Sequence, residues 1–369
     1  MKLTTKTTHQ ARALTVTVSL AFAASNAACV STQTTTASTG TASGGSASSV
    51  ASGSTTGTST SKGTTGSSTG SGTGGASGTP GFVDQLNAMQ GQLPEGLFVR
   101  AQEAYFGLAP LGKIMRADLP GGAVHDFGSI PTPPANGGFL LGITLDAAGN
   151  VYVGFGAGPG TPVQNGIYKI PAAGGAVTAP FAQHPEMNFP NGLWLDPSND
   201  IYVADSGGAI FDVKPDGTAT KWASDPSLVG TSMACAHAAP FAIGANGIVR
   251  IGNDFYVSNT NIGQIVKIPI QANGSAGVAS VFAGPDCDAL GGIDGIAVDS
   301  DGVSILGLVN TQNKLVRIGS NGAVTTVYAG KPLDNPASLV LDGKTLYVTN
   351  SAFFDMASPM PGLLSIPLP

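Results

Sequence analysis

The chain has 369 residues, a formal net charge of −6 and only 10% charged residues, and 53 of its residues are glycine. This composition is too apolar for a wholly disordered chain, and an acidic balance without a long basic run argues against nucleic acid as a partner. The many glycines and prolines, with few charged stretches, favour an all-β fold over a helical one.

The N-terminus carries the pattern of a bacterial export signal. A basic stretch precedes an apolar run over 13–24 that is too short to span a bilayer stably, so residues 1–28 are predicted to be a signal peptide. Ala27-Ala28-Cys29 resembles a lipoprotein box, in which Cys29 becomes the lipidated first residue, although Asn26 replaces the usual aliphatic residue. We expect an exported, membrane-anchored lipoprotein on an outer-membrane, periplasmic or surface face. The alternative is a freely secreted or periplasmic product cut after Ala27.

A long segment of low complexity follows the signal. Residues 29–80 are almost purely Ser, Thr, Gly and Ala, which cannot bury apolar surface, so we predict a disordered tether. A coil of this kind spans about 40 Å, which suits holding a domain away from a membrane. A spacer or glycosylated stalk without an anchor is the alternative.

The remaining residues, 81–369, repeat one unit: an innermost strand, an acidic turn, a second strand and a third strand. The opening residues of the six copies lie 43 to 55 residues apart, and they are Gly96, Gly142, Gly192, Gly247, Gly295 and Ser338. This period predicts a six-bladed β-propeller of four-stranded antiparallel blades. The last copy ends on its third strand at 363–368, so the segment before Pro94 is expected to donate the fourth strand and close the ring.

The residue before each opening position predicts a metal site. Innermost strands run in the same direction beside a propeller's axis, so equivalent residues converge on one channel mouth. These residues are Glu95, Leu141, Asn191, Asn246, Asp294 and Ala337. Four of the six carry oxygen ligands with a total charge of −2, which suits Ca²⁺ best and leaves Zn²⁺, Mn²⁺ and Mg²⁺ open. The alternative interpretation is that Asn-Gly and Asp-Gly are merely turn dipeptides, but that does not explain four at one register.

These motifs also carry a family resemblance. Pro94-Glu95-Gly96, Pro190-Asn191-Gly192-Leu193, Asn246-Gly247 and Ile293-Asp294-Gly295 resemble the senescence marker protein/gluconolactonase family, which includes regucalcin and, more distantly, the paraoxonases. The resemblance covers about 94–369. It implies a six-bladed propeller that holds Ca²⁺ or another divalent ion through Glu95, Asn191, Asn246 and Asp294.

The resemblance also implies an activity, namely metal-dependent hydrolysis of a small-molecule lactone or ester with Asp294 as the candidate base. Two departures weaken the step to sugar lactones. Phe189 stands where the sugar-acid enzymes of the family have an Arg, and Leu141 stands near the position of the paraoxonase-type His. The competing function is a non-enzymatic tethered propeller that binds carbohydrate or protein, with the metal as a structural element. In either case a monomer is favoured, and the membrane is a partner only through the N-terminal anchor.

Two histidines are further catalytic candidates. His184 and His237 lie in loops that lead into blades three and four on the metal face, where each could reach the pocket. For both, a surface loop histidine without a catalytic role is the alternative.

Three cysteines bear on the same face. With Cys29 lipidated, Cys235 and Cys287 remain, and both lie in loops on the metal face of neighbouring blades four and five. In an oxidising compartment we expect them to form a disulfide that stiffens the pocket rim. Two free thiols that bind metal are the alternative.

Overall fold

The computed structural model describes residues 78–369 except 136, 159, 238 and 356. The predicted signal peptide, Cys29 and residues 29–77 of the tether lie outside the described residues. Within the part of the chain that is described, no helix is long and apolar enough to cross a membrane.

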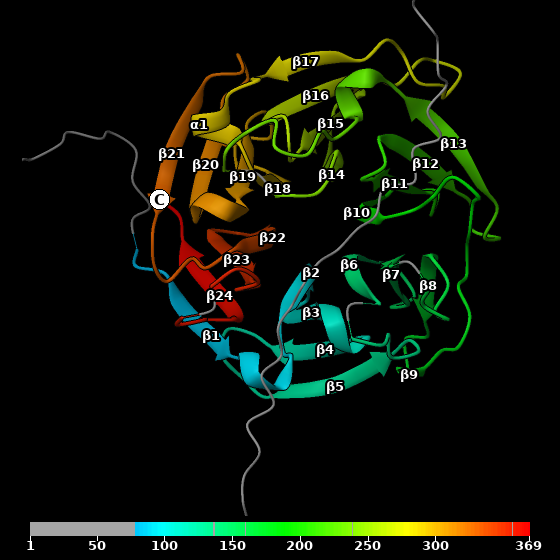
Figure 1. Ribbon diagram of the computed structural model, residues 1–369, viewed down its shortest axis with the longest axis vertical. Coiled ribbons are helices and arrows are strands. Elements are labelled where there is room, and N and C mark those ends of the chain that lie inside the picture. The colour runs from blue at the N-terminus through cyan, green and yellow to red at the C-terminus, as the bar shows by residue number, and fades with distance from the viewer. Residues whose placement is uncertain (1–77, 136, 159, 238, 356) are drawn as a thin grey trace, which may run out of the picture. The chain divides into compact units, whose positions relative to one another are not determined.

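The strands of the described residues form six sheets arranged around a central axis, with β2, β6, β10, β14, β18 and β22 innermost (Figure 1). The prediction of a six-bladed propeller is confirmed. Blades one to three contain β2 (Pro94–Arg100), β3 (Glu103–Leu108), β4 (Lys113–Asp118), β5 (Val124–Ser129), β6 (Gly138–Leu145), β7 (Val151–Ala157), β8 (Gly166–Ile170), β9 (Gly175–Ala176), β10 (Pro190–Leu195), β11 (Ile201–Asp205), β12 (Ala209–Val213) and β13 (Ala219–Ser224). Blades four to six contain β14 (Ala245–Ile251), β15 (Asp254–Asn259), β16 (Gln264–Pro269), β17 (Ser280–Ala283), β18 (Ile293–Val298), β19 (Ile305–Val309), β20 (Lys314–Ile318), β21 (Val324–Ala329), β22 (Pro336–Asp342), β23 (Thr345–Asn350), β24 (Gly362–Pro367) and β1 (Gly81–Gln85).

The helices of the described residues are single turns in the loops between strands. They are η1 (Ala88–Gln90), η2 (Ala109–Leu111), η3 (Pro226–Leu228), α1 (Cys287–Leu290) and η4 (Asn310–Gln312).

The ring closes as the repeat predicts. In blade six the strand order is β1-β24-β23-β22, so the first described strand supplies the outer edge of the last blade. The register pairs Gly81 with Ser365 and Gln85 with Gly362, antiparallel throughout. Because both ends of the described chain share one sheet, closure is a hydrogen-bonded pairing and no free edge remains between them.

Blade two departs from the regular four-stranded pattern. Its named sheet has three strands, and the fourth place is taken by a segment that bridges Ile167 to Ala182. The adjacent Pro180 has no N–H to donate to a ladder. Just upstream, the short β9 pairs in parallel with β5 of blade one, which draws this part of the chain away from its own blade.

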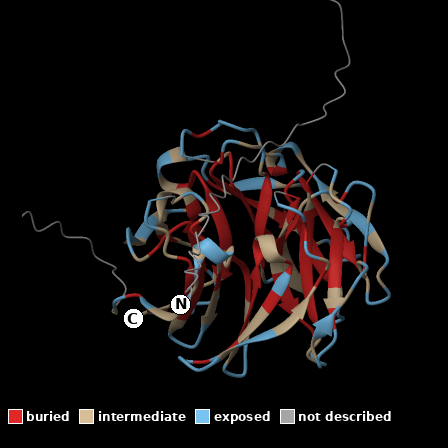
Figure 2. Cartoon of the chain, turned by 60° about the horizontal axis from the view of Figure 1, so that its bottom comes forward, coloured by how far each residue is buried: buried red, intermediate tan, exposed pale blue. Residues whose placement is uncertain are grey.

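The core lies between the blades. Six clusters of buried apolar residues are found among the described residues, one for each pair of neighbouring blades. Each cluster combines the facing surfaces of two sheets, as Leu97 and Phe106 of blade one do with Tyr347 and Leu363 of blade six. Figure 2 shows this arrangement, with buried strands inside and exposed loops around them. The blades therefore hold one another in register, which fixes where their innermost strands begin.

Candidate metal centre

The four predicted ligands occupy one position in the fold. Glu95, Asn191, Asn246 and Asp294 are each the second residue of an innermost strand, and 3–8% of each residue is exposed. They lie within strands and not in turns, so the interpretation as turn dipeptides does not describe them. Because the strands are equivalent members of one ring, these side chains belong to one level of the channel mouth.

A glycine follows each of the four predicted ligands and also Leu141, and a close approach between neighbouring blades explains all five glycines. A Cβ placed on Gly142 would lie 2.0 Å from the carbonyl oxygen of Asn191, and one on Gly192 would lie 2.2 Å from that of Asn246. Gly96, Gly247 and Gly295 have the same relation to the next blade, at 2.0–2.7 Å. A side chain is excluded there because it would overlap the backbone of the equivalent position in the next blade.

A second layer of polar side chains, from the loop after each second strand, supports the four ligands. The Nδ2 of Asn191 donates to Ser206 Oγ at 3.4 Å, and the Nδ2 of Asn246 donates to Thr260 Oγ1 at 2.9 Å. Ser206 in turn donates to the carbonyl oxygen of Ala245 at 3.0 Å. Each hydroxyl thus engages an amide nitrogen, which leaves the amide oxygen available to a cation, and ties its blade to the next one.

The two carboxylates are supported in a similar way. The Nδ2 of Asn310 donates to Asp294 Oδ2 at 3.0 Å within blade five. Ser351 of blade six donates to Glu95 Oε2 at 3.0 Å in blade one, so this contact crosses the closure of the ring. Second-layer partners of this kind orient metal ligands.

The electrostatics of the mouth favour bound positive charge. Burial raises the pKa of Glu95 well above its usual value, the charge of Asp294 raises it further, and the hydrogen bond from Ser351 opposes both. Burial raises the pKa of Asp294 to about 7, against hydrogen bonds from Asn246 and Asn310 that lower it. Two buried carboxylates that repel each other are costly unless they are protonated or share a cation.

The donor set fits a hard divalent ion. Two carboxylates and two amide oxygens are the ligands that Ca²⁺ takes in proteins, with waters or substrate completing the shell. Among the described residues no three His, Cys, Asp or Glu side chains gather into a possible metal site. A metal at this mouth would therefore need the amide oxygens as well, which suits Ca²⁺ better than Zn²⁺.

The rim loop before β14 brings His237 to this face. Thr311 donates to the carbonyl oxygen of His237, and Thr311 follows directly on Asn310, the partner of Asp294. His237 itself is exposed. Its loop thus reaches from blade four to the rim of blade five, beside the second layer of the mouth.

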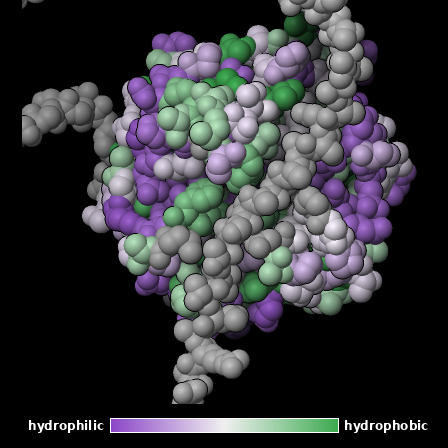
Figure 3. Space-filling view, viewed as in Figure 1, coloured by the Kyte–Doolittle hydropathy of each residue, from purple (hydrophilic) through white to green (hydrophobic). Residues whose placement is uncertain are grey.

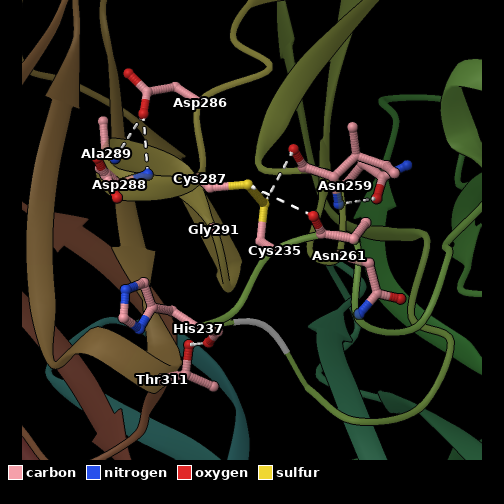
Figure 4. The surroundings of a disulfide bond; sticks show 12 residues. Cys235, His237, Asn259, Asn261, Asp286, Cys287, Asp288, Ala289, Gly291 and Thr311 are labelled. Atoms are coloured by element: carbon pink, nitrogen blue, oxygen red, sulfur yellow. Dashed lines mark hydrogen bonds between the residues drawn. A yellow bond between two sulfur atoms is a disulfide. The ribbon is translucent and has the colours of Figure 1, made fainter. Parts of the chain in front are cut away.

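A disulfide holds the same loop. Cys235 and Cys287 are joined, with Cα atoms 5.2 Å apart, and Cys287 opens α1 just before β18 (Figure 4). The loop also presents apolar surface, because Val229 is 46% and Met233 is 72% exposed. Figure 3 shows this as a green area over the segment between η3 and β14. These cysteines are a covalent link across the rim and not free thiols.

His184 has a different environment. Its ring packs against Phe211 of β12, the third strand of blade three, with ring centroids 4.9 Å apart. Its Nδ1 accepts a hydrogen bond from the backbone N–H of Glu186 at 3.1 Å. These contacts belong to the outer part of a blade and not to the ring of four ligands.

Sequence reasoning missed the second layer, although a signal was present. Ser206, Thr260, Asn310 and Ser351 each lie four residues after the first residue of a Tyr-Val or Leu-Gly pair in the second strand. Polar residues at one register of four repeats are the same kind of signal that identified the ligands.

Together these features define a six-bladed propeller with a buried, oxygen-lined metal-site candidate at one mouth of its channel. The family model described as the SMP-30/gluconolactonase/LRE-like region matches residues 244–352, which include Asn246 and Asp294. The family resemblance predicted from the motifs is confirmed over that stretch. None of the curated proteins matches the chain significantly.

Solved structures with the same fold include enzymes and a calcium-binding protein. Regucalcin from Agrobacterium tumefaciens, described as calcium-binding, has a TM-score of 0.57 and 17% identity over 78% of this chain and 92% of its own. A gluconolactonase from Xanthomonas campestris has a TM-score of 0.55 and 17% identity over 75% of this chain and 86% of its own. A PQQ-bound aldose sugar dehydrogenase from Streptomyces coelicolor has a TM-score of 0.53 and 16% identity over 80% and 100%. At these identities the comparisons show the fold and leave the chemistry to the site.

Proposed function

We propose that this chain is an exported, divalent-metal-binding propeller that hydrolyses a lactone or related ester. The observation that carries the proposal is the pair of buried, mutually repelling carboxylates, Glu95 and Asp294, at one level with two amide side chains. Such an arrangement costs free energy in a protein that holds no cation there, and a bound Ca²⁺ relieves it.

The chain's own groups have distinct parts in this reaction. A bound divalent ion would polarise the substrate carbonyl and stabilise the oxyanion that forms on it. Asp294 accepts the proton of the attacking water, and Asn310 fixes the carboxylate by holding Oδ2 at 3.0 Å. Ser351 and Thr260 orient Glu95 and Asn246 as ligands. His237, exposed at the rim, is a candidate for the group that gives a proton to the leaving group.

The cellular setting is part of the same proposal and is supported by the sequence alone. The signal-like residues 1–28, Cys29 and the Ser/Thr/Gly-rich segment support a propeller outside the cytoplasm on a lipid-anchored tether. Mass spectrometry of the mature N-terminus tests this. A diacylated Cys29 supports the anchor, whereas an unmodified N-terminus at Ala28 contradicts it.

The hydrolase proposal is tested with purified protein on a panel of lactones and aryl esters, with Ca²⁺ and with excess chelator. We expect turnover that needs the metal and that D294N abolishes. Turnover that persists in chelator would contradict the mechanism. Tight Ca²⁺ binding without turnover on any substrate would instead support the non-enzymatic propeller that binds carbohydrate or protein.

A further inference from the structure

The mouth of the channel is chemically unequal around its circumference. The positions equivalent to the four ligands are Leu141 in blade two and Ala337 in blade six, and both are buried. These two blades flank blade one, so the oxygen ligands of blades three, four and five face a sector that, apart from Glu95, presents hydrocarbon.

Two aromatic rings add to this apolar sector. Phe139 lies two residues before Leu141 in β6, and Phe353 lies two residues after Ser351 in the loop of blade six. Their ring centroids are 5.9 Å apart with an interplanar angle of 73°. This contact joins blades two and six, the two neighbours of blade one, which carries Glu95. Both rings are only half-buried, which leaves ring surface open at the mouth.

The backbone fixes where Phe353 lies. Ser351 is held by Glu95, and Ala352 then adopts a left-handed φ of 54°, which turns the chain sharply before Phe353. The N–H of Phe354, the residue after Phe353, donates to Asn335 Oδ1 at 2.8 Å. Phe353 thus lies in a segment that is held by hydrogen bonds both before it, at Ser351, and after it, at Phe354.

A third phenylalanine, Phe189, lies directly before β10 of blade three. A Cβ on Gly156 would lie 2.3 Å from Cδ2 of Phe189, so the Phe189 ring rests on the bare backbone of β7. Gly156 is also the cross-strand partner of Phe139. The N–H of Phe189 donates to the buried Asp205 Oδ2 at 2.7 Å, which holds this segment two residues before Asn191.

We propose that Phe139, Phe189 and Phe353 form a subsite for the apolar substituent of the substrate, so that this mouth takes neutral lactones or esters with an alkyl or aryl group and not polyhydroxylated ones. The inference rests on the proposed function for the identity of the reacting group. The subsite itself is inferred only from the positions of these three rings beside the candidate ligands. Aromatic faces gain from covering hydrocarbon, whereas sugar hydroxyls placed against them lose hydrogen bonds to water.

The experiment measures binding separately from turnover. Calorimetry with Ca²⁺-loaded protein is carried out on γ-lactams, which resemble γ-lactones and resist hydrolysis, bearing no side chain, a propyl chain or a hexyl chain. A polyhydroxylated lactam completes the series. We expect Kd to fall by up to about fourfold per methylene, and the hexyl compound to bind at least tenfold tighter than the unsubstituted and polyhydroxylated ones.

Matched variants locate the subsite. F353A and F139A should each flatten the dependence on chain length, whereas F354A, which removes a neighbouring ring that is 44% exposed, should leave it as in the wild type. Equal affinities within twofold across the wild-type series, or tighter binding of the polyhydroxylated lactam, would overturn the proposal even if lactones are hydrolysed. Chain-length-dependent binding without any lactone turnover would keep the subsite and contradict the hydrolase.

Discussion

Replacement of Asp294 by asparagine removes one of the two carboxyl groups buried at the channel mouth. Burial raises the pKa of Asp294 from an ordinary 3.8 to about 7. Between these values the folded protein binds more protons than the unfolded chain, so the metal-free protein loses stability as the pH rises through this window. At about 1.4 kcal/mol per pH unit, the loss between pH 5 and pH 7 is roughly 3 kcal/mol for this group.

The assay is urea unfolding of wild type and D294N at pH 5 and pH 8, in chelator and in saturating Ca²⁺. In chelator, we expect the wild type to lose at least roughly 3 kcal/mol of unfolding free energy on going to pH 8, because the raised pKa of Glu95 adds to the loss from Asp294, and D294N to lose clearly less. The variant should therefore be the more stable protein at pH 8 without metal, although it binds Ca²⁺ poorly. Saturating Ca²⁺ should remove the pH dependence of the wild type, because the ion favours the charged carboxylate.

Asp301 provides the control for surface charge. It is paired with Arg317 at 2.6 Å, and hydrogen bonds and that charge outweigh its slight burial and lower its pKa to about 2. Its contribution to stability is complete above pH 4 and is lost only as the pH falls through about 2, so D301N should not change the pH 5 to pH 8 difference. A metal-free wild type that gains stability toward pH 8, or a D294N protein with the wild-type slope, would refute the reasoning.

Three further predictions concern the surroundings of the mouth. C287S should lower the free energy of unfolding by up to about 4 kcal/mol, because the disulfide joins residues 52 apart in sequence; an unchanged urea midpoint under oxidising conditions would contradict this. G192A should cost about 1–3 kcal/mol and weaken Ca²⁺ binding, since its Cβ would meet the next blade's carbonyl oxygen at 2.2 Å; G81A, with open space around it, should be within about 0.5 kcal/mol of wild type by thermal unfolding. S351A should weaken Ca²⁺ binding about 10- to 100-fold by calorimetry, and equal affinities of S351A and the exposed-loop variant S358A would count against a second-layer role.

Much of the fold followed from a short repeat. The alternation of a glycine-led strand, an acidic turn and a Tyr-Val strand predicts the innermost pair of strands in each blade, and the leftover segment before Pro94 predicts β1 as the closing strand. The irregular fourth place of blade two was not predicted. It depends on β9 pairing with β5 of the neighbouring blade, a contact between segments that no local pattern relates.

The candidate ligands could be predicted from the sequence more readily than the side chains that hydrogen-bond to them. The same position in the repeat is held by Glu95, Asn191, Asn246 and Asp294. Because the innermost strands are equivalent members of a ring, residues at the same position lie at the same level along the channel. The pairing of Ser351 with Glu95 is different, because 256 residues separate the two and only closure of the ring brings blade six beside blade one.

The sequence by itself determined the number of blades and predicted the four candidate oxygen ligands, because both follow from a period that can be read along one chain. The tertiary structure decided why glycine follows each ligand, since the reason is the carbonyl of the next blade and not a turn. It also decided that the Phe139 and Phe353 rings meet, and that the Phe189 ring packs on Gly156, the cross-strand partner of Phe139. Phe139 and Phe189 hold the same position in their copies, two residues before Leu141 and Asn191, but Phe353 comes from a loop after a second strand. The contact of Phe353 with Phe139 therefore depends on how the blades are arranged, which local sequence does not encode.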